Sequence, residues 1–502
     1  MPENRICTSI AVDSFSSIQE AVLRNESRSE FIEIRLDALP YVPDVAEISS
    51  LSSSSNVILT LRPSSRGGMG DLEDKQRVSF WTSVSENLSM FDDKMLFDLE
   101  HDIVSGILLP RKRVIASIHD FSGDITDKES LLQTLASHAD TVKIAWMAED
   151  AEEAIGIFPL QEFARSLGIN LIPIAMGEAG KLSRILAVPQ GAPFSYCTPE
   201  AGAPTAPGQI SGTDLDELYR MNSIGESTVV FGLIAGDTAY SHSPKIHNSI
   251  FREALSDSVF VPMQTRDIRA LIARIFSDEF PFQVGGFAVT NPFKIEAMEL
   301  ADELDDTAKM TGAVNTLKVL EGRLKGFNTD VHGFIIPLKR RLPELESSRV
   351  AVIGTGGAAR AAIAALTEEK CEVTVFGRDE SKLSLLREEF QIATENLSGK
   401  RFGEFRAVVN ATPLGTMGRL EDESVASATT LEGAQLAYDL VYNPSETKFL
   451  REARRAGCQL LGGIEMLIEQ AAEQQRIWTG KSADTEKLIV SIRTEGDVTR
   501  SA

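Results

Sequence analysis

Metal-binding and disulfide-forming residues are sparse in this sequence. The four cysteines, Cys7, Cys197, Cys371 and Cys458, are scattered, and the six histidines do not cluster with carboxylates at ligand spacing. We therefore expect neither a disulfide framework nor a metal site. No apolar run approaches the length that spans a membrane, and no signal-peptide pattern precedes the first strand-like segment. These absences predict a cytoplasmic protein without a membrane partner.

Positive charge is also in deficit. Lysine and arginine number 50 against 73 aspartates and glutamates, which gives a net charge of −23. Such an acidic chain argues against a surface for nucleic acid or anionic lipid, so an anionic ligand has to be bound by local basic side chains. The composition is otherwise that of a globular protein, and 502 residues are too many for one core. We expect two or three domains.

Short apolar strands alternate with helical segments in the first 224 residues. Helical periodicity is clear, for example, over residues 128–139 and 151–167. The expected strands are residues 6–12, 31–36, 57–61, 94–99, 113–118, 141–145, 170–175 and 193–197. This alternation predicts a (β/α)8 barrel over residues 1–224. A doubly wound open sheet is the alternative, although it would more often begin with a glycine-rich turn.

Polar residues at the strand ends of this region form a coherent set, and strand ends are where a barrel carries its chemistry. Glu33, Arg35 and Asp37 alternate with apolar neighbours and therefore point to one face. Lys143 lies inside an apolar strand, where burying an ammonium group is costly. Such a lysine forms either a structural ion pair or a Schiff-base nucleophile. Because His119 ends the preceding strand, we favour the nucleophile, with His119 as its acid–base partner.

The same region resembles the type I 3-dehydroquinate dehydratases. It contains, in their order and spacing, the motifs EIRLD, TLRP, SIHDF, VKIA, AMG…SR and APGQ. The resemblance implies a Schiff base between Lys143 and the substrate ketone, with His119 moving the protons. The implied substrate contacts are Glu33, Arg35, Arg62, Arg184, Thr205 and Gln209. Thr205 replaces a common serine, and Arg66 replaces a glutamate that commonly orients the histidine, so we expect Glu33 or Asp120 to supply that carboxylate.

A second α/β unit begins with the strand Val229–Ala235, after a short polar connection. The segments Ser241-His242-Ser243-Pro244, Val289 to Lys294, Gly312 to Thr316 and Gly326 to Asp330 each have an ordinary explanation, such as a helix cap. Together they resemble the shikimate dehydrogenases, over residues 229 to 480. The resemblance implies Lys294 and Asp330 as the catalytic pair. The implied substrate contacts are Ser241, Ser243, Thr290, Asn315, Tyr442 and Gln470, although Gln470 taken alone fits an exposed helix residue.

A glycine-rich turn after an apolar strand predicts a dinucleotide site. Gly354, Gly356 and Ala359 occupy the positions where such a fold needs small residues, and the following helix offers free N–H groups to phosphates. The next strand ends in Gly377-Arg378-Asp379, where arginine suits a 2′-phosphate and therefore NADP. The neighbouring carboxylate slightly weakens that preference, and Arg360 could add charge nearby. The expected cofactor contacts are Gly354, Gly356, Gly357, Ala358, Ala359, Arg378, Lys382, Thr412 and Gly463.

These observations predict a bifunctional enzyme of the shikimate pathway. A dehydratase barrel (1–224) precedes a substrate-binding lobe (228–335) and an NADP-binding lobe (345–495), whose last helix returns to the substrate lobe. The barrel would dehydrate 3-dehydroquinate, and the dehydrogenase would reduce the 3-dehydroshikimate formed to shikimate. The alternatives are a catabolic quinate dehydrogenase using NAD, a ligand-binding regulator without turnover, and a sugar-phosphate aldolase in the barrel. The sequence leaves the oligomeric state open.

Overall fold

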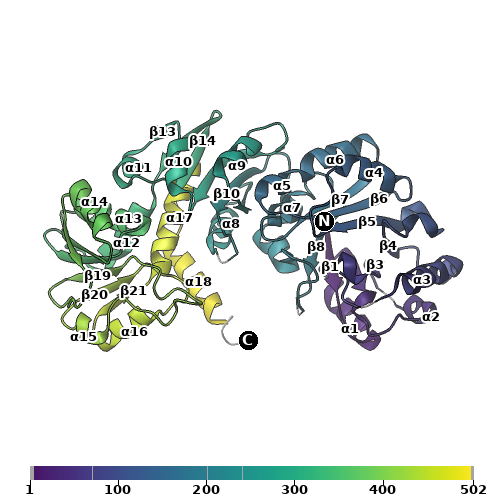
Figure 1. The fold of residues 1–502 in the computed structure, drawn as a ribbon, viewed down its shortest axis with the longest axis horizontal. Helices are drawn as coiled ribbons and strands as arrows, with labels where there is room; N and C mark the ends of the chain where they lie inside the picture. Colours follow the sequence, from purple (N-terminus) through teal and green to yellow (C-terminus); the bar gives the residue numbers. More distant parts are fainter. Residues whose placement is uncertain (1–4, 52, 71, 201, 240, 499–502) are drawn as a thin grey trace. The chain divides into compact units, whose positions relative to one another are not determined.

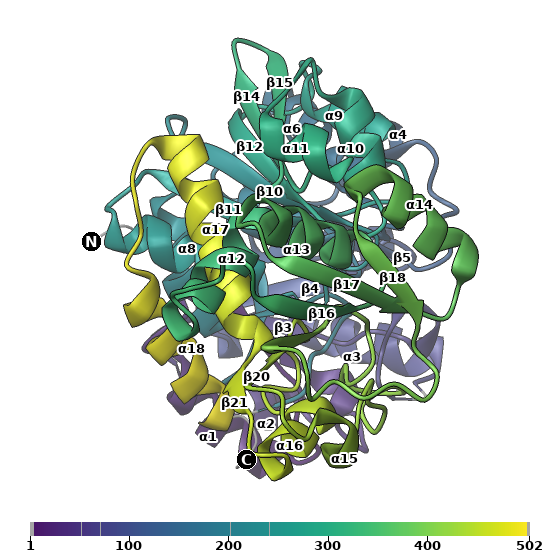
Figure 2. The same ribbon diagram turned by 90° about the vertical axis from the view of Figure 1, so that its left-hand side faces the viewer.

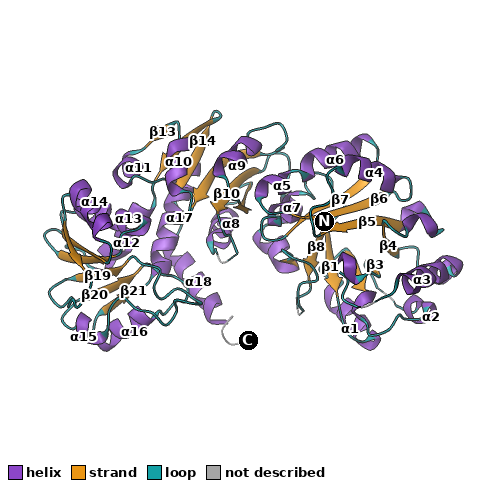
Figure 3. Cartoon of the chain, in the orientation of Figure 1, coloured by secondary structure: helices purple, strands orange, loops and turns teal. Residues whose placement is uncertain are grey.

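The chain forms two compact units, Met1–Val284 and Gly285–Ala502. The computed structural model describes residues 5–51, 53–70, 72–200, 202–239 and 241–498. The first unit contains the barrel together with the first strands and helices that follow it, and Figure 3 distinguishes its helices from its strands. Across the described ranges, no helix is both long enough and apolar enough to cross a membrane.

A parallel sheet forms the barrel. Its strands are β1 (Ile6–Ile10), β2 (Phe31–Arg35), β3 (Asn56–Thr60), β4 (Leu96–Glu100), β5 (Val114–Asp120), β6 (Thr141–Met147), β7 (Asn170–Met176), β8 (Ser195–Thr198) and β9 (Ile210–Ser211). They are paired in the order β7-β6-β5-β4-β3-β2-β1-β8-β9, so the last barrel strand lies beside the first. This order confirms the (β/α)8 prediction. Among the described residues no backbone pairing joins β7 to β8, which leaves a seam in the ring.

The barrel helices lie outside the ring of strands (Figure 1). They are α1 (Phe15–Asn25), α2 (Val45–Ser49), α3 (Asp74–Glu86), α4 (Lys128–Ala136), α5 (Ala151–Ile155), α6 (Ile157–Ser166) and α7 (Lys181–Leu186). The single helix expected over residues 151–167 was wrong. The Gly156 N–H bonds to the Glu153 carbonyl, three residues back, and the helix breaks there into α5 and α6. After the last barrel strand the chain forms a π-helical turn, Asp214–Leu218, followed by the 3₁₀ turn Met221–Ser223.

The remaining part of the first unit contains β10 (Val229–Ala235), α8 (Ser243–Glu253), β11 (Ser258–Gln264) and α9 (Ile268–Ile275). β10 and β11 pair in parallel. At the start of the second unit, β12 (Gln283–Val289) pairs antiparallel with β14 (Thr316–Leu320), and β14 pairs antiparallel with β15 (Arg323–Phe327). The other elements are α10 (Lys294–Leu300), β13 (Glu303–Leu304), α11 (Asp306–Thr311) and α12 (Asp330–Arg341). In this sheet β12 ends shortly before α10 begins, and β15 ends shortly before α12 begins.

A parallel sheet of nucleotide-binding topology completes the second unit. Its strands are β16 (Arg349–Ile353), β17 (Glu372–Gly377), β18 (Ala393–Asn396), β19 (Ala407–Asn410), β20 (Leu436–Asp439) and β21 (Gln459–Leu461). Its helices are α13 (Gly357–Glu368), α14 (Glu380–Phe390), α15 (Ala428–Leu431), α16 (Lys448–Arg455), α17 (Gly463–Thr479) and α18 (Thr485–Val498). The spatial order β18-β17-β16-β19-β20-β21 is that of a Rossmann sheet, which binds its ligand where the order reverses. This arrangement confirms the predicted fold class.

Both faces of this sheet are buried, as the apolar sequence of β16 requires. Val350 and Val352 belong to the core on one face, whereas Ala351 and Ile353 belong to the core on the other. The helix α17 packs along α12, and Figure 2 shows the two side by side. That packing carries residues from the last part of the chain to the first turn of α12.

Candidate active sites

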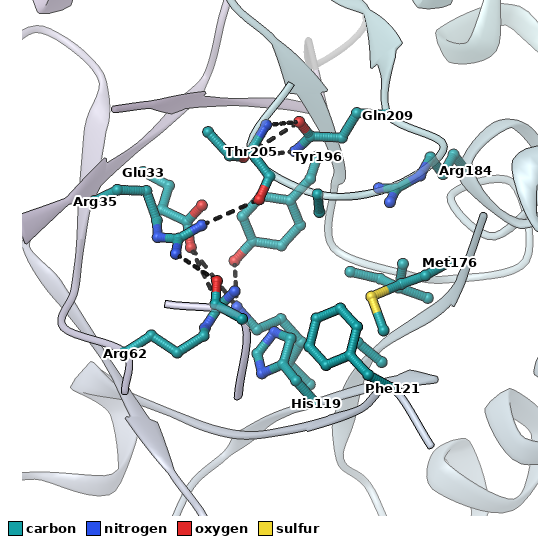
Figure 4. Close-up of a pocket in the computed structure, with 15 residues that line it drawn as sticks. Glu33, Arg35, Arg62, His119, Phe121, Met176, Arg184, Tyr196, Thr205 and Gln209 are labelled. Carbon is teal, nitrogen blue, oxygen red and sulfur yellow. Dashed lines mark hydrogen bonds and ion pairs between the residues drawn. The ribbon is translucent and has the colours of Figure 1, made fainter. Parts of the chain in front are cut away.

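A cavity opens in the barrel, and the empty space between its lining side chains is about 420 Å³, open solvent included. Its lining includes every substrate-binding and catalytic residue that the sequence assigned to the barrel: Glu33, Arg35, Arg62, His119, Lys143, Arg184, Thr205 and Gln209. Figure 4 labels all of these side chains except Lys143 around one space, although they come from distant parts of the sequence. The fold brings them together because parallel barrel strands all end at the same edge. Their individual roles remain predictions.

Lys143 extends from β6 towards this cavity, and only 1% of its surface is exposed. Its Nζ bonds to the Asp98 carboxylate and lies 3.7 Å from Glu33 Oε1. The same Nζ donates to the Tyr196 hydroxyl at 3.3 Å. Lys143 is therefore ion-paired and also lines the cavity, and its role as a nucleophile stays a prediction.

His119 faces the same cavity from β5 and is held by an acid that was not predicted. Its Nδ1 lies 2.6 Å from Glu100 Oε1. The expectation that Glu33 or Asp120 would supply this carboxylate was wrong. Two hydroxyl groups donate to Glu33, and Asp120 accepts main-chain N–H groups of residues 122–125. Arg66 donates to the main-chain carbonyl of His119 at 3.4 Å.

Sequence reasoning missed two acids on β4, Asp98 and Glu100. They alternate along β4 as Glu33 and Arg35 do along β2, so a period of two was the available signal. The strand was expected to end at Leu99, one residue short of Glu100. Both acids are buried, and both partner the residues predicted to be catalytic.

The cationic side chains of the cavity differ in how fully they are paired. Arg35 forms an ion pair with Asp37 at 2.6 Å. The expectation that both lie on one strand was wrong, because β2 ends at Arg35 and Asp37 lies in the 3₁₀ turn that follows. Arg184 donates through Nη2 to the Pro207 carbonyl at 3.1 Å, while its Nε has no hydrogen-bond partner among the described residues. Burial lowers the pKa of Arg184 to about 10, so the guanidinium is still charged at neutral pH. Arg184 is thus the candidate for binding a substrate carboxylate.

The charges of the cavity set the protonation of the two central acid–base groups. Burial opposes ionisation of Glu33, but Lys143, Arg62 and Arg35 together lower its pKa to about 2. Burial also lowers the pKa of His119 well below its ordinary value, and Arg62 and Lys143 lower it further. His119 is therefore neutral at physiological pH and able to accept a proton.

Thr205 and Gln209 close one side of the cavity. The Thr205 N–H donates to Gln209 Oε1 at 2.7 Å, and Gln209 Nε2 donates to Thr205 Oγ1 at 3.0 Å. Between them, Gly208 has φ +69°, and a Cβ there would lie 2.1 Å from the Gly177 carbonyl oxygen. Only glycine permits this close approach. The motif Pro-Gly-Gln therefore folds the loop against the Gly177 turn.

The second candidate site joins the first residues of α10 and α12. Lys294 Nζ donates to Asp330 Oδ2 at 2.6 Å. Asn315 Nδ2 donates to the other carboxylate oxygen at 2.8 Å, which fixes the orientation of that group. Gln470 Oε1 accepts from Thr329 Oγ1 at 3.3 Å. Gln470 is 8% exposed, so the expectation that it is an exposed helix residue was wrong, because α17 packs against α12.

The other predicted substrate contacts occupy strand and helix ends. Thr290 follows β12, and its carbonyl accepts the Phe293 N–H at 3.0 Å. Ser241 and Ser243 belong to the first unit and lie at the start of α8, where the Ser243 N–H donates to Ser241 Oγ at 3.2 Å. Tyr442 follows β20, and burial raises the pKa of its hydroxyl. Contact of these residues with a substrate stays a prediction.

The turn between β16 and α13 has the geometry of a dinucleotide site. Gly354 has φ +131°, and a Cβ there would lie 2.7 Å from the Ala411 carbonyl oxygen. A Cβ at Gly356 or Gly357 would meet no atom within 4 Å, so the backbone borders open space at the start of α13. Ala359 is fully buried. Small residues thus stand where the turn is tight and where a pyrophosphate has to approach the helix N-terminus.

The other predicted cofactor contacts occupy neighbouring strand and helix ends. Ala358 lies in the first turn of α13. Thr412 follows β19, where its hydroxyl donates to Asn410 Oδ1 at 2.7 Å. Gly463 is the first residue of α17, and a Cβ there would lie 2.5 Å from the Leu440 carbonyl oxygen. Close packing is thus a sufficient reason for glycine at position 463.

The end of β17 carries the two basic residues that were predicted to bind the 2′-phosphate of NADP. Arg378 is exposed there, and Lys382 is exposed on the first turns of α14. The Asp379 carboxylate accepts the N–H groups of Ser381 and Lys382, so it caps α14. Asp379, the acid that weakened the NADP prediction, therefore has a structural role as the N-cap of α14. Arg360 does not support that prediction, because its guanidinium bonds to the Thr311 carbonyl and to the Glu389 carboxylate.

Comparison with protein families matches both parts of the chain. A model of the type I 3-dehydroquinases matches residues 6–226. The model of the shikimate dehydrogenase substrate-binding domain matches residues 233–317, and that of the shikimate/quinate 5-dehydrogenases matches residues 338–421. A model of the shikimate 5′-dehydrogenase C-terminal domain matches residues 463–489.

Similar proteins cover either the whole chain or its second part. The bifunctional 3-dehydroquinate dehydratase/shikimate dehydrogenase, chloroplastic, of Arabidopsis thaliana is 29% identical, over 96% of this chain and 83% of its own. The shikimate biosynthesis protein AroDE of Chlamydia muridarum is 26% identical, over 94% of both chains. The shikimate dehydrogenase (NADP(+)) of Pelobacter propionicus is 38% identical, over 50% of this chain and 91% of its own.

Proposed function

We propose that this chain, which belongs to the shikimate dehydrogenase family and also carries a type I 3-dehydroquinase domain, catalyses two consecutive reactions of the shikimate pathway. The barrel dehydrates 3-dehydroquinate to 3-dehydroshikimate, and the second part reduces that product to shikimate with NADPH. The observation that carries the first reaction is the cavity shared by Lys143 and His119. The observation that carries the second is the Lys294–Asp330 pair.

In the barrel, we assign the covalent step to Lys143. Its amine condenses with the substrate ketone, water leaves, and the iminium that forms acidifies the adjacent C–H bond. Neutral His119 accepts the proton from that carbon and returns it to the departing hydroxyl group, which leaves as water. Hydrolysis of the imine then releases the product and restores the lysine. Arg184 binds the substrate carboxylate, with Nε as the donor that has no hydrogen-bond partner among the described residues.

In the second part, we assign the proton transfer to Lys294. The reduced nicotinamide supplies hydride to the carbonyl carbon. Lys294 protonates the carbonyl oxygen, and the ion pair with Asp330 holds its ammonium group in place. Asn315 and Gln470, together with Ser241, Ser243, Thr290 and Tyr442, are assigned to the substrate. Gly354, Gly356 and Gly357 fit the pyrophosphate, and exposed Arg378 and Lys382 fit the 2′-phosphate of NADP.

The proposal also includes the limits of the three domains and the location of the protein in the cytoplasm. The limits 1–224, 228–335 and 345–495 follow the functional parts, whereas the compact units divide at Val284. Limited proteolysis that releases an active dehydratase ending near residue 224 would support the functional limits. Location in the cytoplasm is testable by cell fractionation.

A coupled assay with 3-dehydroquinate and NADPH tests the two activities in one tube. We expect Lys143→Ala to consume NADPH only when 3-dehydroshikimate is added. We expect Lys294→Ala to form 3-dehydroshikimate but to reduce it about 10²- to 10⁴-fold more slowly. Lys112→Ala is the matched control, because Lys112 is exposed and lies outside both sites. Wild-type rates in either active-site variant would exclude the corresponding assignment.

Substrate and cofactor comparisons separate this function from its relatives. Oxidation of shikimate with NADP is expected to exceed oxidation of quinate with NAD. Faster turnover of quinate with NAD would favour the catabolic alternative instead. Binding of both substrates without turnover by the wild type would favour a regulator.

A further inference from the structure

His119 and Glu100 form a hydrogen-bonded pair. Of the two, only His119 is among the described residues that line the barrel cavity. Glu100 lies behind it on the neighbouring strand β4, where Glu100 is in register with Ser117 of β5. The His119 Nδ1 to Glu100 Oε1 distance is 2.6 Å, and the two residues are 4% and 2% exposed. Glu100 therefore contacts the imidazole without being placed to contact a substrate.

Burial raises the pKa of Glu100, and Arg62 is the largest cause that lowers it. Arg62 Nε lies 3.4 Å from the same Oε1 atom, and a guanidinium at that distance stabilises the ionised acid. Two neighbouring acids bond elsewhere: Asp98 accepts from Ser117 and Lys143, and Glu33 accepts from Ser9 and Thr60. A neutral imidazole next to a carboxylate carries its single proton on the nitrogen that faces the acid. For His119 that nitrogen is Nδ1.

We infer that Glu100 is the positioning residue for His119, because it holds the proton on Nδ1 and leaves Nε2 free to act as the base in the cavity. The inference rests on the dehydratase reaction proposed above. When Nε2 takes the proton from the substrate carbon, the imidazole becomes a cation beside the Glu100 carboxylate. When Nε2 returns that proton to the departing hydroxyl group, water leaves and the neutral ring is restored. The Nδ1 proton stays in place throughout.

The test substitutes Glu100→Gln, which preserves the size of the side chain and removes its charge. An amide can donate to Nδ1, which would place the ring proton on Nε2 and block the base. We expect kcat for dehydration to fall about 10²- to 10⁴-fold, with KM changed no more than a few-fold. Borohydride trapping with 3-dehydroquinate should still label Lys143, because the covalent step does not need His119 as a base in this scheme.

Nitrogen NMR supplies a readout that does not depend on turnover. In protein labelled with ¹⁵N-histidine at neutral pH, we expect the His119 ring to carry its proton on Nδ1 in the wild type. In Glu100→Gln the proton is expected to move, at least in part, to Nε2. The resonances are assigned with His119→Gln. A wild-type ring protonated on Nε2 would overturn the inference, whatever the rates are.

A second acid on the same strand end provides the control. Asp102 lies two residues after Glu100, pairs with Arg77 and does not line the cavity. Asp102→Asn should keep wild-type kcat and the wild-type tautomer. Equal kcat in Glu100→Gln and wild type would contradict the role of Glu100 while leaving the dehydratase function intact. Joint loss of kcat and of Lys143 trapping would show a merely structural effect of Glu100, and an inactive wild type would instead contradict the proposed function.

Discussion

Removing the Lys143 ammonium group should lower the stability of the barrel as well as abolish its dehydratase activity. The variant Lys143→Met keeps the length and burial of the side chain but removes one of the two cations that contact Asp98 and Glu33. The other cation, Arg62, lies 4.0 Å from Asp98 and 3.8 Å from Glu33. Breaking a buried ion pair by removing one partner typically costs about 3–5 kcal/mol, because the remaining charge is buried and unpaired. Both acids are almost fully buried, so this range applies to the barrel.

The pKa of Glu33 provides an independent magnitude and a pH window. That pKa is lowered from 4.5 to about 2, and although burial opposes the shift, Lys143 is the largest cause that lowers it. At 1.36 kcal/mol per unit, the shift corresponds to about 3 kcal/mol, an order-of-magnitude figure for wild type. A lowered acid pKa stabilises the fold above the ordinary value. That contribution is lost as the pH falls from 4.5 towards 2.

The cost of breaking the ion pair and the free energy from the Glu33 pKa shift both predict a loss of stability that one unfolding experiment can measure. Urea unfolding of wild type and Lys143→Met, followed by tryptophan fluorescence, should differ by about 3–5 kcal/mol at pH 7. The difference should shrink clearly at pH 3. Trp81 and Trp146 report on the barrel, and NADPH oxidation reports separately on the second unit. Lys112→Met is the control. A difference below about 1 kcal/mol at pH 7, or one that does not change with pH, would refute the reasoning.

Three further predictions concern the second unit. Arg378→Gln should raise KM for NADPH about 10- to 100-fold, because a charge-assisted bond to phosphate contributes about 1.5–3 kcal/mol. KM for NADH should stay unchanged, and an unchanged ratio of the two KM values would contradict the prediction. Burial raises the pKa of Asp439 to about 6, so wild type should lose thermal stability as pH rises from 4 through 6, and Asp439→Asn should flatten that slope. Heat-inactivation midpoints of NADPH oxidation measure the effect, and parallel profiles would count against it. Gly354→Ala should cost about 1–3 kcal/mol through its positive φ and weaken NADPH binding, whereas Gly225→Ala, in open space, should change neither.

The pH dependence of Asp439 has a specific structural origin. Its carboxylate accepts the Val441 N–H and an Asn410 side-chain N–H at 3.0 and 2.9 Å, and also a hydroxyl group from Thr447. These bonds favour the ionised form but do not offset burial, which remains the dominant cause of the raised pKa. The protonated acid is therefore the form that the folded state prefers below about pH 6.

The sequence alone determined which strands exist and which of their ends carry polar residues. A strand has a period of two, so Glu33 and Arg35 could be placed on one face before any contact was known. The glycine turn at Gly354 and the arginine at the end of the next strand were recognisable for a similar reason, because local backbone geometry restricts the residues that fit there. Local rules of this kind predicted the fold class and singled out Lys143 and His119, whereas Lys294 and Asp330 were predicted from the resemblance to the shikimate dehydrogenases.

Only the tertiary structure decided which acids partner Lys143 and His119 in the barrel. Glu100 reaches His119 across two neighbouring strands, and Gln470 reaches Thr329 because α17 packs along α12. Sequence spacing carries no information on such pairs, since the partners are far apart along the chain and their distance depends on strand register and helix packing. Pairing, burial and the resulting pKa values are properties of the assembled cavity, whereas the residue types at strand ends are properties of the chain.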